Sequence, residues 1–135
     1  MDNIKRELCL SAIRAMNNSY SPYSGYKVGS ALLTDDGEIF TGCNIENASY
    51  SPTVCAERVA IFKAVSEGKR HIKMIAVAGG QNGSISTGAA PCGVCRQVMT
   101  EFCSEDMPVL IVTSNSGEYK ETSLGELLPL AFNLK

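Results

Sequence analysis

Cys55-Ala56-Glu57-Arg58 and, later in the chain, Pro91-Cys92-Gly93-Val94-Cys95-Arg96-Gln97 are the two stretches around which the sequence is organised. Together they carry three thiols and one carboxylate at spacings that chemistry can use. Cys92 and Cys95 stand three residues apart, so on the first turn of a helix both side chains face the same way. If both stretches begin helices, their N-termini can present three sulfur atoms to one ion.

Both stretches have the features of a helix start. Pro91 is typical of that position, and Ser51-Pro52-Thr53 supplies capping and initiation residues ahead of Cys55. The partial positive charge of a helix N-terminus helps to keep sulfur as thiolate. Three protein ligands on a tetrahedral zinc leave the fourth position to water, which is the catalytic arrangement. Glu57 could be an ordinary solvated helix glutamate. Two positions from a ligand, however, it is the candidate proton carrier, because zinc lowers the pKa of a bound water to about 7 and this water needs a group that takes its proton.

The same cysteines allow other interpretations. They could be small buried packing residues, or Cys92 and Cys95 could form a thioredoxin-like redox pair. A structural four-thiolate zinc would need a fourth sulfur. The remaining cysteines have no neighbour at ligand spacing and are expected to pack in the core: Cys9, Cys43 and Cys103. His71 is the only histidine, which excludes a zinc site made of three histidines.

Arg58 also has two interpretations. It could be an ordinary surface charge. Alternatively, three thiolates outweigh the two positive charges of Zn²⁺, which weakens the metal as a Lewis acid. A neighbouring guanidinium that donates to the sulfurs would offset that excess negative charge.

Length and composition favour a single soluble domain spanning residues 1–135, with 44% hydrophobic and 19% charged residues. The charged N-terminus is unlike a secretory signal, and no apolar run approaches the roughly 18 residues of a membrane span, so no membrane association is expected. Six cysteines without an export signal indicate a reducing, cytoplasmic setting. A net charge of −2 argues against a nucleic-acid partner and favours a small uncharged substrate.

The hydrophobic pattern predicts a layered α/β domain. Helices are expected at 3–17, 54–67, 92–103 and 123–128, and strands at 27–34, 38–43, 73–78, 108–113 and 118–121. Residues 79–90 have the composition of a glycine- and serine-rich loop. The expected architecture is a three-layer α/β/α arrangement with a mixed, roughly five-stranded sheet covered on both faces. Helical crossovers require the later strands to be parallel, with ligands bound beyond their carboxyl ends.

A second group of polar residues lies at 42–50. In an extended chain, Asn44 and Glu46 point to the same side. An amide and a carboxylate placed in this way can grip a pair of hydroxyls, as on a ribose. The alternative is a polar loop at the end of a strand.

Taken together, 55–58, 91–97 and Cys43-Asn44-Ile45-Glu46-Asn47-Ala48 closely resemble the small, three-cysteine, homotetrameric zinc cytidine deaminases. The similarity extends to Ser21-Pro22-Tyr23-Ser24 and Val28-Gly29 near the start, and to Glu126-Leu127-Leu128-Pro129 and Ala131-Phe132 at the end. It covers nearly the full chain, and the paired zinc motifs are highly specific. The implied fold is cytidine deaminase-like.

The resemblance implies an activity and its machinery. Cys55, Cys92 and Cys95 would bind one Zn²⁺ per subunit, and Glu57 would shuttle protons. The implied reaction is hydrolytic deamination of free cytidine and deoxycytidine to uridine and deoxyuridine plus ammonia, as in pyrimidine salvage. Zinc hydroxide would attack C4 of the base, while Glu57 moves a proton to N3 and then to the departing amine.

The resemblance also implies contacts with a nucleoside. Asn44 and Glu46 would hold the ribose, and the backbone at Ala56 would lie close to the base. Tyr26 occupies a position where the family usually has a phenylalanine that packs on the base, and its extra hydroxyl needs a partner or water. Tyr50 and Phe132 match aromatic positions that reach into a neighbouring subunit's site, which implies a homotetramer with shared active sites.

Two other functions fit parts of the pattern. A deaminase for a cytosine nucleoside antibiotic such as blasticidin S shares the zinc motifs, although residues 44–47 and Arg58 favour cytidine. A redox protein, from a different class, would use Cys92 and Cys95 as a reversible disulfide. The loop at 79–90 is longer than is usual in the family, and Ala89-Ala90 replaces a serine common before Pro91. We expect these differences to have little effect on zinc binding.

Overall fold

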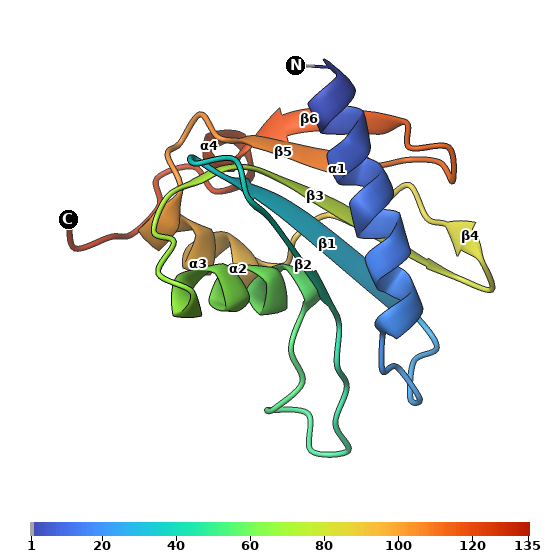
Figure 1. The fold of residues 1–135 in the computed structure, drawn as a ribbon. Coiled ribbons are helices and arrows are strands. Elements are labelled where there is room, and N and C mark those ends of the chain that lie inside the picture. The colour runs from blue at the N-terminus through green and yellow to red at the C-terminus, as the bar shows by residue number, and fades with distance from the viewer. Residues whose placement is uncertain (1) are drawn as a thin grey trace.

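The structure is a computed structural model that describes residues 2–135, and within that range the strands form one six-stranded mixed sheet (Figure 1). The strands are β1 (Lys27–Thr34), β2 (Ile39–Cys43), β3 (Ile72–Gln81), β4 (Ser84–Ile85), β5 (Pro108–Val112) and β6 (Tyr119–Ser123). Their order is β2-β1-β3-β5-β6, and β4 pairs with the end of β3. The pairing of β3 with β5 is parallel, and the other pairings are antiparallel. The predicted mixed sheet is confirmed.

Helices cover both faces of this sheet. They are α1 (Asp2–Ala15), continued by the 3-10 turn η1 (Met16–Asn18), α2 (Ala56–Ser66), α3 (Gly93–Phe102) and α4 (Leu124–Leu127). Figure 1 shows α1 on one side of the sheet, with α2 and α3 next to each other on the opposite side. The three-layer α/β/α architecture is therefore as predicted. None of the helices in the described range is long and apolar enough to cross a membrane.

The alternation of side chains along the strands separates two hydrophobic cores. On β1, Ala31 and Leu33 face α1, whereas Leu32 faces α2 and α3. The same alternation on β3 sends Met74 to the α1 side and Ile75 to the other. Because both faces are buried, these strands appear in the sequence as continuous apolar runs.

Helix α2 lies unusually close to strand β2. A Cβ atom at Gly42 would stand 2.5 Å from both the Ala56 carbonyl oxygen and the Ala60 amide nitrogen. Only a residue without a side chain therefore allows this approach. The close packing fixes the N-terminal end of α2, and with it Cys55 and Glu57, against the sheet.

The sixth strand is a correction to the sequence prediction, which placed a loop over 79–90. Strand β3 continues to Gln81, and the chain then turns back through Asn82 and Gly83, whose φ angles are 54° and 78°. An Asn-Gly pair with two positive φ angles is a strong two-residue hairpin signal. The prediction of a loop rested on the glycine and serine content of the segment and did not use this hairpin signal, so it did not include β4.

Candidate active site

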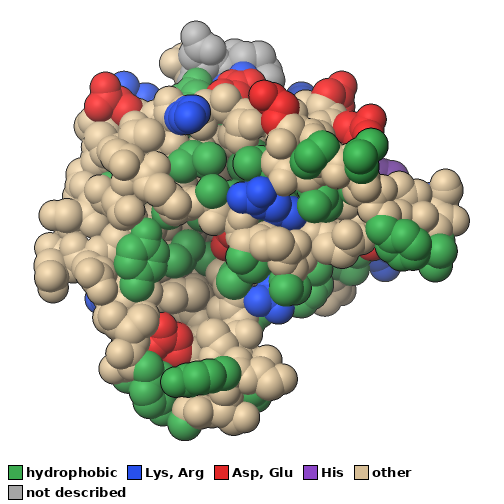
Figure 2. All heavy atoms as spheres, turned by 180° about the vertical axis from the view of Figure 1, so that it is seen from behind, with side chains coloured by type: hydrophobic (Ala, Val, Ile, Leu, Met, Phe, Trp, Pro, Cys, Tyr) green, Lys and Arg blue, Asp and Glu red, His purple; other side chains and the backbone are tan. Residues whose placement is uncertain are grey.

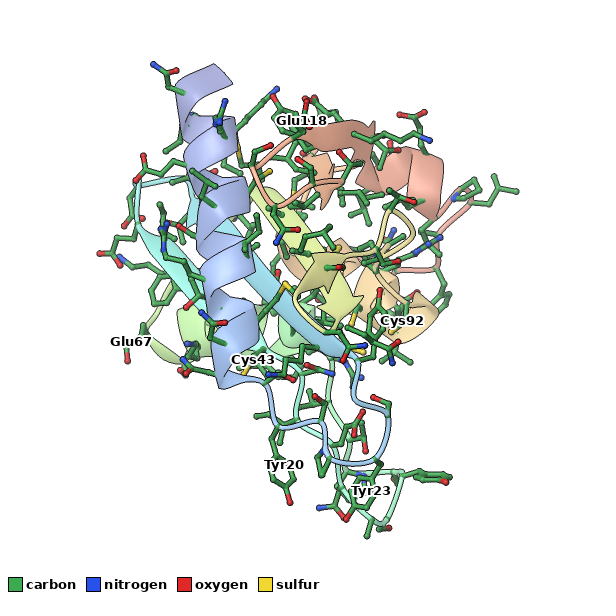
Figure 3. The ribbon with its side chains drawn as sticks, turned by 90° about the vertical axis from the view of Figure 1, so that its right-hand side faces the viewer. Tyr20, Tyr23, Cys43, Glu67, Cys92 and Glu118 are labelled. Atoms are coloured by element: carbon green, nitrogen blue, oxygen red, sulfur yellow. The ribbon has the colours of Figure 1, made fainter. Side chains whose placement is uncertain are left out.

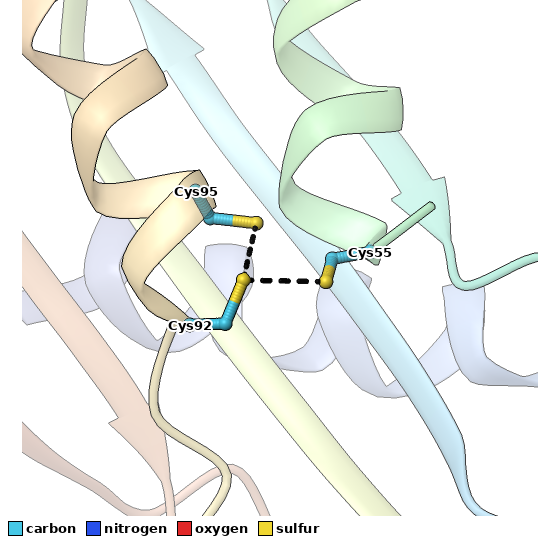
Figure 4. A group of neighbouring side chains, drawn as sticks. All are labelled: Cys55, Cys92 and Cys95. Atoms are coloured by element: carbon cyan, nitrogen blue, oxygen red, sulfur yellow. Dashed lines mark hydrogen bonds between the residues drawn. The ribbon is translucent and has the colours of Figure 1, made fainter. Parts of the chain in front are cut away.

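Three cysteine sulfur atoms meet where the N-termini of α2 and α3 face each other (Figure 4). The Sγ atom of Cys92 lies 3.5 Å from that of Cys55 and 3.5 Å from that of Cys95. All three atoms lie within 4.8 Å of one another. Sulfur atoms bound at about 2.3 Å to one tetrahedral zinc are about 3.8 Å apart, so this group has the dimensions of a zinc site.

Local backbone geometry leaves two of these sulfurs free of capping contacts. Cys55 is the N-cap residue of α2 and Cys92 is the N-cap residue of α3, and both have extended backbones. Neither side chain makes a capping hydrogen bond, so each sulfur is available to a ligand. The prediction that Ser51-Pro52-Thr53 caps α2 was wrong, because Cys55 is the N-cap residue; Pro91 lies at the start of α3, directly before its N-cap residue.

Hydrogen bonds within the group set the charge of its sulfurs. The pKa of Cys55 is lowered to about 5, chiefly by the neighbouring Cys95 thiol and also by the Arg58 guanidinium. The Arg58 Nη2 atom donates to the Cys55 Sγ atom over 3.5 Å. The pKa of Cys95 is raised, chiefly by the neighbouring Cys55 sulfur and also by burial. The group thus favours a thiolate at Cys55 beside a guanidinium.

Glu57 brings a buried carboxyl group to the same place. Its residue is only 3% exposed, and its Oε1 atom is buried without a hydrogen-bond partner among the described residues. Burial raises the pKa of Glu57 to about 7, and the neighbouring Cys55 thiolate adds to this shift. Buried polar atoms in proteins are normally paired, so the free oxygen indicates a partner that is supplied from outside the chain. A carboxyl group with a pKa near 7 is suited to moving protons at neutral pH.

A cavity of about 290 Å³ is lined by Glu57 and by two of the three cysteines, Cys55 and Cys92. Its lining includes six residues predicted from the sequence to form the site: Tyr26, Asn44, Glu46, Cys55, Glu57 and Cys92. Ala56 is fully buried beside it in the first turn of α2. The volume lies at the small end of the range for sites that bind small molecules.

Asn44 is held rigidly in the cavity wall. Its Oδ1 atom accepts hydrogen bonds from the Val28 amide at 2.9 Å and the Ser19 hydroxyl at 2.5 Å. Its Nδ2 atom donates to the Tyr26 carbonyl oxygen at 2.9 Å. An amide group has two N–H donors, so one of them is left for a ligand.

Two predicted site residues lie away from this cavity within a single chain. Tyr50 is 87% exposed and Phe132 is 69% exposed. Tyr50 instead lines a neighbouring surface hollow that shares Glu46 and Thr53 with the cavity. The Phe132 carbonyl oxygen accepts a hydrogen bond from Gln97 Nε2 at 2.9 Å, which places this tail segment beside α3.

Sequence reasoning missed several residues that shape the site. The cavity wall also contains Val28, Thr53, Val54, Val77, Gly88, Ala89 and Ala90. Arg96 was not assigned a role, yet its Nε atom donates to the Pro91 carbonyl at 2.7 Å and its Nη1 atom donates to the Leu127 carbonyl at 2.8 Å. Arg96 therefore holds the segment that leads into Cys92. The position of Arg96 directly after Cys95 was the one feature of the sequence that could have indicated this role.

Comparison with known proteins agrees with this geometry. The family described as "Cytidine and deoxycytidylate deaminase zinc-binding region" matches residues 2–111. The chain is 49% identical over 127 residues to a cytidine deaminase from Sporosarcina psychrophila, covering 94% of this chain and 90% of the relative. The crystal structure of cytidine deaminase from Burkholderia pseudomallei is similar with a TM-score of 0.80 and 45% identity, covering 93% of this chain and 97% of that one. Similarity to a blasticidin-S deaminase from Bacillus cereus is lower, at 30% identity over 111 residues, covering 79% of this chain and 77% of the relative.

Proposed function

The chain belongs to the zinc-dependent cytidine deaminase family, and we propose that the cavity at Glu57 is where it hydrolyses free cytidine and deoxycytidine to uridine and deoxyuridine, releasing ammonia. The enzyme is a cytidine deaminase with Zn²⁺ as its cofactor. Its higher identity to cytidine deaminases than to the blasticidin-S enzyme favours cytidine over the antibiotic.

The strongest support for the proposed site is the arrangement of the sulfurs and the Glu57 carboxyl group around the cavity. Three sulfur atoms converge beside a buried carboxyl group that has an unpaired oxygen, and Glu57 lines the same cavity as two of the cysteines. In the described part of the chain, the group that could hold an ion consists of three cysteines, and two of them line the cavity. A closed four-thiolate cage would not leave such access.

The proposed roles follow from these positions. Cys55, Cys92 and Cys95 hold the metal, and the chemistry supplied there by bound zinc is Lewis-acid activation of water near neutral pH. Glu57 takes a proton, delivers it to N3 of the pyrimidine and later protonates the departing amine. Burial keeps water away from its carboxyl group, so charge changes on it act strongly on the substrate. Arg58 offsets the negative charge of the sulfurs through its contact with Cys55.

The walls of the cavity orient the nucleoside in this proposal. Asn44 and Glu46 hold the sugar, the backbone at Ala56 lies near the base, and Tyr26 packs against the base. Tyr26 lies just before β1, and Asn44 and Glu46 follow β2, so two separate segments line one hollow and can fix both ends of a small ligand at once.

A direct experiment tests the function. We expect one zinc per subunit, loss of cytidine absorbance on incubation with the enzyme, arrest of that reaction by a chelator and recovery on adding zinc. A reversible Cys92–Cys95 disulfide without stoichiometric zinc would instead indicate a redox protein. Bound zinc without any turnover of cytidine would indicate a structural metal module.

Replacing Gly79 by alanine should weaken substrate binding. A Cβ atom there would lie 2.9 Å from both the Tyr26 Cε1 atom and the Ala89 Cβ atom. Both residues line the cavity, so they must move into it to relieve the contact. We expect kcat/KM for cytidine to fall by about 10- to 100-fold, mainly through KM, with unchanged zinc content. Steady-state kinetics checks this, and adding Ala89→Gly to the variant should recover part of the loss. Normal KM in Gly79→Ala would contradict the packing argument.

We also propose that the enzyme is a homotetramer with shared active sites. Tyr20, Tyr23, Ile45 and Tyr50 are exposed hydrophobic residues. Figure 3 places Tyr20 and Tyr23 on the loops that project from the sheet, and Figure 2 shows hydrophobic side chains gathered on a projecting part of the surface. An exposed cluster of this kind is typical of an interface. Sedimentation should give a mass of four chains, and a stable active monomer would contradict this proposal.

The cellular setting is a further proposal. All six cysteines are free thiols, which suits a reducing compartment. We place this single catalytic domain in the cytoplasm, acting in pyrimidine salvage on free nucleosides.

A further inference from the structure

We propose that Ser24 is a positioning residue, whose hydroxyl group aims the Glu46 carboxylate at the sugar of the substrate. This inference rests on the proposed role of Glu46 in holding the sugar. Ser24 lies on the loop between α1 and β1 and has had no function so far.

The loop around Ser24 holds both oxygen atoms of the carboxylate. The Oε1 atom of Glu46 accepts hydrogen bonds from the Tyr23 amide at 2.9 Å and the Ser24 amide at 3.1 Å. The Oε2 atom accepts from the Ser24 hydroxyl group. The Ser24 hydroxyl is the largest of the influences that lower the pKa of Glu46, so the group is a carboxylate at neutral pH.

The direction of the Ser24 hydroxyl is itself determined. Its oxygen accepts a hydrogen bond from the Tyr26 amide at 3.0 Å, so its single proton is left to point at Glu46. The Ser24 carbonyl oxygen accepts from Gln81 Nε2 at 3.2 Å, which ties the loop to the end of β3. One small side chain thereby connects the sugar-binding carboxylate to the backbone of Tyr26, another residue of the cavity.

The two oxygen atoms of the Glu46 carboxylate differ in how many hydrogen-bond acceptor positions they have left for the substrate. A carboxylate has about four acceptor positions, two on each oxygen. Oε1 uses both of its positions on backbone amides, whereas Oε2 uses one on Ser24. The open position is therefore on Oε2, the same oxygen that Ser24 holds. Without that hydroxyl, the terminal torsion of Glu46 is restrained only through Oε1, and this type of torsion is soft.

The test compares two substrates that differ only in sugar hydroxyls, cytidine and 2′,3′-dideoxycytidine. Ser24→Ala should lower kcat/KM for cytidine by about tenfold, mostly through KM, since a hydrogen bond to a charged group is lost. The same variant should change kcat/KM for dideoxycytidine by less than about twofold. Ser24→Thr, which keeps the hydroxyl, should restore cytidine turnover. A general loosening of the loop would instead affect both substrates alike.

Two further variants make the result decisive. Ser49→Ala, the same change at an exposed position on the loop that carries Glu46, should leave both substrates unaffected. Glu46→Gln should lose far more activity on cytidine than on dideoxycytidine. If Glu46→Gln discriminates but Ser24→Ala does not, the inference about Ser24 alone is overturned. If Glu46→Gln impairs both substrates equally, the sugar-binding role is overturned, and the inference with it. Failure of Ser24→Thr to recover cytidine turnover also overturns the inference.

Discussion

Replacing Glu57 by glutamine is expected to lower kcat by at least about 10²–10⁴-fold while zinc stays bound. Glutamine preserves the shape of the side chain but cannot accept and return a proton. The substitution leaves the three sulfurs of the proposed metal site unchanged, because the carboxyl group is not one of its ligands. The fold should persist, since the substitution removes an ionisable group from a position that is only 3% exposed.

Three measurements separate this chemical defect from structural damage. Cytidine turnover gives kcat, metal analysis gives zinc per subunit, and thermal unfolding reports on the fold. Glu67→Gln is the matched control, because it makes the same change at the exposed C-cap residue of α2, away from Cys92 in Figure 3. Near-normal turnover in Glu57→Gln would remove this residue from the mechanism.

Cys92→Ala should abolish activity by removing the metal. Cys92 lies between the other two sulfurs, with its Sγ atom 3.5 Å from each. Its loss leaves two ligands from different helices, too few for a tetrahedral site with one open position. Zinc that binds only the native state stabilises it by about 3–4 kcal/mol when its free concentration is 100- to 1,000-fold above Kd. The variant should therefore also unfold at a lower temperature.

The chelator response shows whether that destabilisation comes from the metal. A chelator should lower the Tm of the unaltered enzyme but leave that of Cys92→Ala unchanged, because site assembly and folding are linked. Cys43→Ala is the matched control, since it removes a half-buried thiol at the end of β2, outside the sulfur group. A folded, active and metal-free Cys92→Ala protein would contradict the proposed metal centre.

Structural features that depend only on residues close together in the sequence were predictable. The strand at Lys27–Thr34 was predicted with the bounds that it has, because its apolar run is bordered by turn residues. The Ser123 cap was also predictable, since its side chain accepts a hydrogen bond from the Glu126 amide only three residues away. Strand β4 could have been found by giving more weight to Asn82-Gly83. Such signals depend on local backbone preferences, which are the same in any fold.

The amino-acid sequence was enough to identify the groups that can do chemistry, namely three thiols at ligand spacing, one carboxyl group beside them and a polar stretch at 43–48. It also determined the layered α/β class, because hydrophobic periodicity records which faces are buried. Three features became visible only in the folded protein: Gly42 lets α2 approach the sheet, Glu57 is removed from solvent, and Ser24 meets Glu46 across two loops. Burial and hydrogen bonding between distant segments depend on how the layers pack, and no local pattern in the chain encodes that packing.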